Sequence, residues 1–300
     1  MPKSKRKRSR RSKPGIIPGV LAWALVLLFL LFTLLALLAV LRPRTPKKVY
    51  PTRPQIPKGK PLASSQIKPS KSHRAPKNFK RPRVALIIDD MGQRPILERK
   101  FFKLGLTLNF SFLPYAPFTE KLAREAHQKG FTVMIHIPME AENEKNSGPG
   151  TLKLFMTEKE IKDKVREMIS RVPFASGANQ HMGSLFSQDP LKMKWVLEVL
   201  RENHLFFIDS RTTPYTIAPF VAQSLKIPFA ERGHFLDNNL QEVALEKSFE
   251  NMLAKARKQG RLIVIAHPHP QTLKLLKHHR KDLIDQVTLV PVQKLVEVRP

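Results

Sequence analysis

Acidic and imidazole side chains recur at the ends of apolar runs in this chain. Asp89 and Asp90 end the run VALIIDD, His136 lies in TVMIHI, Asp209 ends LFFID and His267 follows LIVIA. Carboxylates and imidazoles exchange protons near neutral pH and bind divalent metals. These residues are therefore candidates for one catalytic or metal-binding site, provided that the fold brings the ends of their runs together.

The apolar runs are short, and they alternate with longer amphipathic stretches, as parallel strands joined by crossover helices do. The helix expected at residues 119–130 has Thr119 as its N-cap and stops at Gly130. Seven or eight such repeats favour a distorted (β/α) barrel, with an open doubly wound sheet as the alternative. In a barrel the carboxyl ends of the strands converge on one face, where active sites lie. Strands are expected at residues 84–89, 106–113, 132–137, 175–180, 205–210, 234–237, 262–267 and 287–291.

The adjacent carboxylates of Asp89 and Asp90 need a particular backbone to act together. One aspartate at a strand end often caps the next helix, but only one of the two could do so. Neighbouring side chains of a strand point to opposite faces. Both reach one site only if the strand has already turned, as the following Met91 and Gly92 indicate.

Two histidines are candidate metal ligands. His136 is followed four residues later by Glu140, and imidazole with carboxylate binds zinc and other divalent metals. His181 lies in GANQHMGS, whose glycines let the backbone approach a ligand closely. For both histidines, a hydrogen-bonded structural role is the alternative.

Three further residues suit catalysis or substrate orientation. His267 precedes a proline and suits a general acid, because the ordinary pKa of histidine lies near neutrality. Asp209 and Arg211, two residues apart, could orient a neighbour or bind an oxyanion, and a plain salt bridge is the alternative. His269 is expected to be exposed and incidental.

The N-terminal part of the chain differs from the rest in charge. Residues 1–83 carry 22 Lys and Arg and no Asp or Glu, whereas residues 84–300 carry 31 basic against 24 acidic residues. The uncharged run that begins at Gly19 and ends at Leu41 is long enough to cross a bilayer as a helix. Residues 3–13 on one flank carry eight basic residues against four in residues 42–48 on the other, which predicts that the N-terminus lies in the cytoplasm.

These features predict four segments. They are a basic cytoplasmic tail (1–15), a single-pass anchor in the inner, cytoplasmic membrane (16–41), a disordered Pro/Lys/Arg-rich linker (42–82) and an α/β domain outside the cytoplasm (83–300). The basic tail is expected to lie against anionic lipid headgroups, and no nucleic acid is expected as a partner. Without cysteine, the chain has no disulfide, thiol nucleophile or zinc thiolate.

Several motifs resemble those of the divergent polysaccharide deacetylases, a branch of the NodB-like carbohydrate esterase superfamily. The likeness covers roughly residues 84–295. It implies a distorted (β/α) barrel, usually of seven strands, and a divalent metal, commonly zinc. The motifs are LIIDDMG, HIPMEA with GPGTL, GANQHMGS, FIDSRTT, HFLDN and IAHPHPQT.

The resemblance also implies residue roles. Asp89 would be the general base, Asp90 and His136 metal ligands and His267 the general acid. The superfamily has a second histidine where this chain has Glu140. His181 would supply the missing imidazole, with Glu140 either joining the ligand set or supporting it.

The expected activity is therefore removal of N-acetyl or O-acetyl groups from an extracytoplasmic glycan, such as peptidoglycan. A catalytically inactive glycan-binding or envelope scaffold protein on the same barrel is the alternative. Glu140 in place of a histidine favours the scaffold, whereas Asp89 and His267 favour the enzyme, because binding alone requires neither base nor acid.

Overall fold

In the computed structural model, the described residues are 81–142 and 145–298, together with Trp23, Leu27, Leu28, Leu30, Leu31 and Thr33. No helix among these residues is long and apolar enough to cross a membrane. The expected tail, anchor and linker lie almost wholly outside the described residues and stay predictions.

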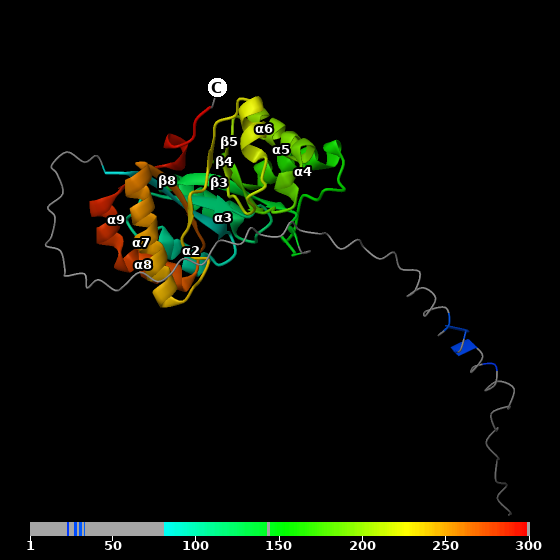
Figure 1. Ribbon diagram of the computed structural model, residues 1–300, viewed down its shortest axis with the longest axis horizontal. Coiled ribbons are helices and arrows are strands. Elements are labelled where there is room, and N and C mark those ends of the chain that lie inside the picture. Colours follow the sequence, from blue (N-terminus) through cyan, green and yellow to red (C-terminus); the bar gives the residue numbers. More distant parts are fainter. Residues whose placement is uncertain are drawn as a thin grey trace, which may run out of the picture. The chain divides into compact units, whose positions relative to one another are not determined.

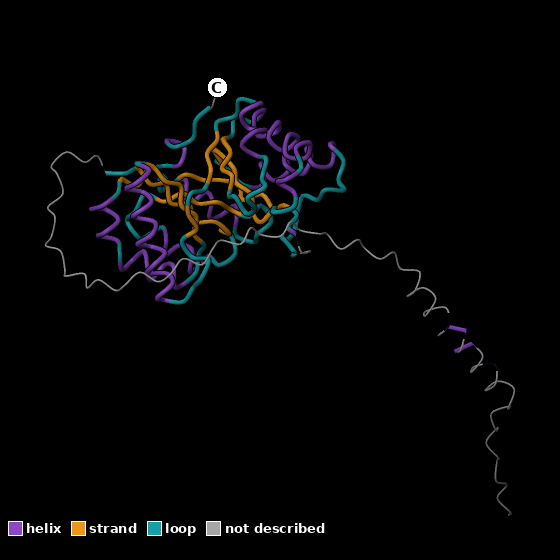
Figure 2. Tube along the Cα trace, viewed as in Figure 1, coloured by secondary structure: helices purple, strands orange, loops and turns teal. Residues whose placement is uncertain are grey.

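Eight parallel strands form one curled sheet, an open half-barrel with helices outside it (Figures 1 and 2). The order across the sheet is β6-β5-β4-β3-β2-β1-β8-β7, and a short β9 (Thr288–Leu289) pairs with β1. The edge strands β6 and β7 do not pair with each other, so the barrel is not closed by hydrogen bonds. The strands are β1 (Arg83–Met91), β2 (Leu108–Phe112), β3 (Thr132–Met139), β4 (Ala175–Met182), β5 (Phe206–Asp209), β6 (Phe229–Glu231), β7 (His234–Phe235) and β8 (Arg261–Ala266).

The helices alternate with the strands, and Figure 1 shows α4, α5 and α6 together on one side and α7, α8 and α9 together on the other. Local signals fix their starts. Thr157 and Glu160 form a capping box on α4, and Asp189 caps α5 just before Pro190. The helices are α2 (Pro95–Phe101), α3 (Thr119–Gln128), α4 (Glu158–Arg171), α5 (Pro190–Glu202), α6 (Ala218–Ser224), α7 (Glu242–Gln259), α8 (Pro270–His278) and α9 (Arg280–Gln286).

Alternation along each strand separates an outer core from an inner one. On β1, Leu86 and Ile88 pack against the helices, whereas Ala85 and Ile87 face the inside of the half-barrel. The inner cluster is completed at the amino ends of the strands by the C-terminal segment, which includes a short 3₁₀ helix (Val292–Lys294). Polar residues in phase with the inner cluster must therefore point into the carboxyl end of the half-barrel.

The expected strands are all present, with shifts of a few residues at their ends. One strand was missed and one expectation was wrong. The main path has eight strands, within the seven or eight repeats expected, but β6 was not expected because its three residues are too few to show a period in sequence. Phe118, not Thr119, is the N-cap of α3, and the Thr119 hydroxyl instead donates to the carbonyl of Leu113.

Candidate active site

A left-handed residue turns β1 so that both of its aspartates reach the inner face. Asp89 is in phase with the inward-facing Ile87 and is 2% exposed. Asp90 would point outward, but its φ is +55° and the pairing of β1 with β2 is irregular here. Left-handed backbone is uncommon outside glycine, and aspartate is among the residues that tolerate it. The strand therefore turns at Asp90 itself, as expected from the following Met91 and Gly92.

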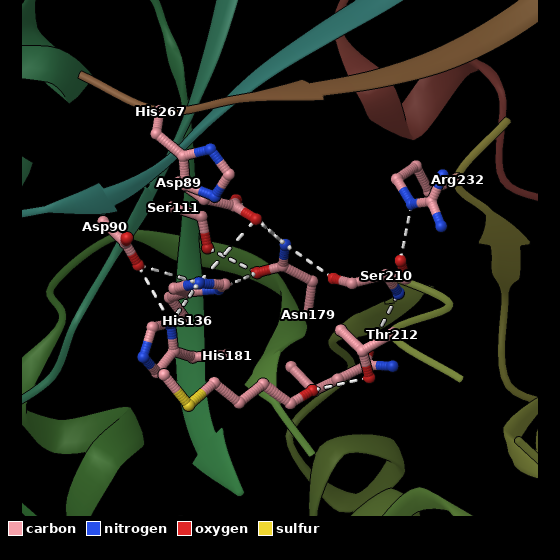
Figure 3. Close-up of polar contacts among 12 residues, drawn as sticks. Asp89, Asp90, Ser111, His136, Asn179, His181, Ser210, Thr212, Arg232 and His267 are labelled. Carbon is pink, nitrogen blue, oxygen red and sulfur yellow. Dashed lines mark hydrogen bonds and ion pairs between the residues drawn. The ribbon is translucent and has the colours of Figure 1, made fainter. Parts of the chain in front are cut away.

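The Asp90 carboxylate meets two imidazoles from β3 and β4 (Figure 3). Its Oδ1 lies 3.2 Å from His136 Nε2 and 2.9 Å from His181 Nδ1, and the two nitrogens are 3.1 Å apart. His136 is in phase with the inward-facing Met134, and His181 lies two residues beyond the buried Asn179. Burial raises the pKa of Asp90, but the neighbouring His136 and His181 imidazoles outweigh burial and hold this pKa well below its usual range.

These three side chains fit a divalent metal. Asp90, His136 and His181 each offer one ligand atom within 4.8 Å of the other two. Asp90 Oδ1 is buried, yet it accepts no well-aligned hydrogen bond from any described residue. Two imidazoles and one carboxylate are a recurrent zinc donor set that leaves a coordination position open. The orphaned oxygen therefore marks where a cation would lie.

Asn179 connects the metal-ligand cluster to Asp89. Its amide nitrogen lies 2.9 Å from both oxygens of Asp89, and its Oδ1 lies 2.8 Å from His136 Nδ1. Ser111 also donates to Oδ1, at 2.6 Å. Because the amide NH₂ faces a carboxylate, its oxygen accepts from His136, which puts the proton on Nδ1 and leaves Nε2 free to bind a metal.

His267 lies beside Asp89 and is held by Asp237. Its Nδ1 is 2.9 Å from Asp237 Oδ1, and its backbone N–H donates to Oδ2 at 2.7 Å. Thr272 donates to the same Oδ2 at 2.7 Å. Burial alone would lower the pKa of His267, but the bond to Asp237 and the charges of Asp237, Asp89 and Asp90 raise it to about 9. His267 is therefore protonated at neutral pH, with Nε2 left for a substrate.

Asp89 is buried beside His136, and each of the two residues is 2% exposed. Burial raises the pKa of Asp89, although the charges of His136 and His267 and the bond from Asn179 act in the opposite direction. A carboxyl group with a raised pKa is a stronger base when it is ionised. Asp89 therefore suits proton abstraction.

Three sequence-predicted residues lie apart from this cluster. Glu140 accepts from the backbone N–H of Leu154 at 2.7 Å and is not part of the ligand group. Asp209 is in phase with the outward-facing Phe207, and its Oδ1 accepts from Gln180 and from the backbone of Arg211. Arg211 pairs with Glu231 through its guanidinium.

His269 was expected to be exposed, and it is partly buried next to His267. Burial lowers its pKa. With Asp237 and His267 it forms a second group of metal-ligand atoms. Both oxygens of Asp237 already accept hydrogen bonds from His267 and Thr272. The role of Asp237 is therefore to hold the His267 imidazole, and no second metal is needed to explain this group.

Sequence reasoning gave no role to the supporting residues Ser111, Asn179, Ser210 and Asp237. All four occupy inward-facing positions near strand ends. Ser210 lies two residues after the inward-facing Ile208, and Asp237 lies two residues after Phe235, so each points to the same face as that neighbour. That signal exists in the sequence, but it requires knowing which alternate set faces inward.

Residues 86–296 match the divergent polysaccharide deacetylase family. The chain belongs to that family. Two curated relatives are uncharacterized: YibQ of Escherichia coli is 32% identical over 71% of this chain and 67% of its own length. A Haemophilus influenzae protein is 30% identical over 73% of this chain and 78% of its own length.

Solved structures show the same fold for this divergent deacetylase family member. An uncharacterized Agrobacterium tumefaciens protein superposes with a TM-score of 0.69, at 18% identity, over 74% of this chain and 92% of its own. A putative cellobiose-phosphate cleavage protein of Enterococcus faecalis has a TM-score of 0.53, at 12% identity, over 72% of this chain and all of its own. At these identities the likeness concerns the fold alone.

Proposed function

We propose that this protein is a metal-dependent deacetylase that removes N-acetyl or O-acetyl groups from an extracytoplasmic glycan. One observation carries the proposal. A buried carboxylate, a group of two imidazoles and one carboxylate, and a protonated histidine held by an aspartate lie together at the carboxyl ends of the strands. Binding alone would not require this combination of base, cation site and acid.

Each residue of the cluster would have a separate role in the reaction. Asp90, His136 and His181 would hold a divalent ion, with zinc the expected metal, and Glu140 would stay a support of the neighbouring loop. Such an ion would polarise the acetyl carbonyl and lower the pKa of water. Asp89 would take the proton of the attacking water, and His267 Nε2 would protonate the leaving nitrogen or oxygen. Asp237 would keep the imidazole oriented and protonated.

The decisive experiment measures acetate released from N-acetylated oligosaccharides, peptidoglycan fragments among them, by the full chain in detergent. Wild type should release acetate, chelation should abolish release, and zinc should restore it. Asp89→Asn should lower kcat by about 100-fold or more, because general base catalysis contributes at least that much. Asp163→Asn, an exposed aspartate on α4, is the control.

A different result would favour the scaffold. Wild type that binds glycan but releases no acetate with any added divalent metal would reject the deacetylase. Full activity after removal of metal, confirmed by elemental analysis, would reject the role given to Asp90, His136 and His181.

The proposed location is the inner membrane, with the N-terminus in the cytoplasm and the domain outside. The support is the apolar run from Gly19 to Leu41. Within it, described helical residues such as Trp23 and Leu27 are 72% and 66% exposed. Membrane fractionation after a high-salt wash tests this, because release by salt would contradict a spanning anchor. Protease should cut the domain only from outside the cytoplasmic membrane.

A further inference from the structure

Arg232, in the short loop between β6 and β7, is a half-buried cation close to the candidate active site. Its Nε donates to the backbone carbonyl of Ser210 at 2.6 Å, and Nη2 donates to that of Arg211 at 2.8 Å. The Phe235 ring lies 3.9 Å from its Cζ. Arginine has five N–H donors, so two are used on uncharged carbonyls and the guanidinium is held in a fixed orientation.

Within residues 81–142 and 145–298, no carboxylate oxygen lies within 4.0 Å of this guanidinium. Its neighbour Arg211, by contrast, is paired with Glu231. Asp209 attracts Arg232 from farther away, but burial raises the pKa of Asp209 and so disfavours its charged form. A cation that has lost part of its water without gaining a counter-ion is unfavourable. The position is therefore suited to an anion that comes from outside the chain.

The same contacts place Arg232 near the reacting groups. The Phe235 ring centroid is 6.1 Å from that of His267, so the guanidinium lies within about 10 Å of the imidazole. Ser210 accepts a 3.3 Å hydrogen bond from Asn179, which in turn holds Asp89. Figure 3 shows this chain of contacts. Arg232 is thus beside the site, at a distance suited to a substituent of the substrate and not to the acetyl group itself.

We propose that Arg232 binds an anionic substituent, a carboxylate or a phosphate, on the glycan whose acetyl group is presented to Asp89 and His267. The planar guanidinium has three unused N–H donors and can bind either group through two of them. This inference rests on the proposed function for the identity of the ligand as a glycan. It makes Arg232 a determinant of specificity and not a catalytic residue.

The test compares three N-acetylated oligosaccharides that differ only in one substituent, which is neutral, a carboxylate or a phosphate. Binding is measured by calorimetry, and acetate release is measured in parallel, with the full chain in detergent. Wild type should prefer at least one acidic glycan by about 10-fold or more, the strength of a charge-assisted hydrogen bond. Arg232→Gln should lose the preference and Arg232→Lys should keep part of it. The two acidic glycans show whether the site selects carboxylate or phosphate.

Arg124→Gln is the matched control, because Arg124 also lies over an aromatic ring, that of Phe174, but is paired with Glu120. It should keep the preference. Equal binding of neutral and acidic glycans by wild type, a preference that survives Arg232→Gln, or no binding of any of the three would overturn the proposal. If Arg232 only braces its loop, Arg232→Gln would weaken binding of all three glycans alike. If acidic glycans bind through Arg232 but no acetate is released, the proposed deacetylase activity is rejected and the anion site stands. If acetate is released without any preference for acidic glycans, the anion site is rejected and the deacetylase stands.

Discussion

At the scale of single residues, the site depends on side chains that hold the reacting groups. Asn179 faces Asp89 with its amide nitrogen and His136 with its oxygen. One amide therefore fixes the position of the proposed base and the tautomer of a proposed ligand. Asp237 does the equivalent for His267. Changes at these two positions should alter measurable properties of the neighbouring groups without removing those groups.

Asp237→Asn should move the alkaline limit of activity to lower pH. The protonated form of His267 is the proton donor, so kcat should fall as pH rises through its pKa of about 9. Without the Asp237 charge the pKa should drop towards the ordinary value of 6.5. The measurement is the dependence of kcat on pH. Asp282→Asn, which removes a carboxylate 2.8 Å from the partly buried His279, should leave the limit in place, and an unchanged limit in Asp237→Asn would contradict the assignment.

Asn179→Ala should weaken metal binding by about 10- to 100-fold, the usual effect of removing the hydrogen-bond partner of a ligand histidine. Competition with a metal-binding dye measures this without relying on turnover. Asn109→Ala is the matched control, because Asn109 is an equally buried amide that bonds the backbones of Leu86 and Val292. It should lower the unfolding temperature and leave metal affinity intact. Equal affinity in Asn179→Ala and wild type would show that the amide does not position His136.

At the scale of elements, period-two alternation explains both the success and the limits of sequence reasoning. The apolar runs predict strands, and their polar ends predict Asp89, His136 and His267 at one face, as observed. The left-handed turn at Asp90 is not encoded by composition, since aspartate tolerates it without requiring it. Asp209 was placed at the site because its strand ends there, but its phase along β5 turns it outward.

The sequence spacing between His136 and Glu140 also could not predict where the Glu140 carboxylate lies. Its four-residue separation from His136 suggests a ligand, but the chain beyond β3 turns so that its carboxylate accepts from the Leu154 backbone. The missing imidazole comes from β4, 45 residues after His136 in sequence. Such a partner depends on the order of strands in the sheet, which local sequence patterns do not specify.

Gly177→Ala should destabilise the domain, because β4 and β5 pack too closely there for a side chain. A Cβ on Gly177 would lie 2.2 Å from the ring of Phe206, which is buried in the inner cluster. Overpacking of this kind costs about 1–3 kcal/mol in the free energy of unfolding. Unfolding in urea measures it. Gly130→Asn is the control, since nothing lies within 4 Å of its Cβ position and asparagine tolerates the left-handed φ of +80°. Equal stability of the two variants would contradict the close approach.

At the scale of the whole molecule, the two ends of the half-barrel have separate tasks. The carboxyl ends of the strands carry the polar cluster, whereas the amino ends are covered by the C-terminal segment. Val292 donates its backbone N–H to Asn109 Oδ1, and Phe229 of β6 forms an antiparallel bridge with Glu297. Because no hydrogen bonds join β6 to β7, the half-barrel is open there, and the C-terminal segment supports this open edge.

Leu295→Ala tests this division between stability and activity. Leu295 is 4% exposed in the inner cluster, and removing a buried leucine side chain costs about 2–5 kcal/mol in the free energy of unfolding. In a domain of this size that loss should lower the unfolding temperature by about 2–4 °C per kcal/mol. Val298→Ala, at a residue 51% exposed, should change stability by less than about 0.5 kcal/mol. Because the polar cluster lies at the other end, acetate release per folded Leu295→Ala molecule should equal that of wild type, and a loss of rate in fully folded protein would show that the ends are coupled.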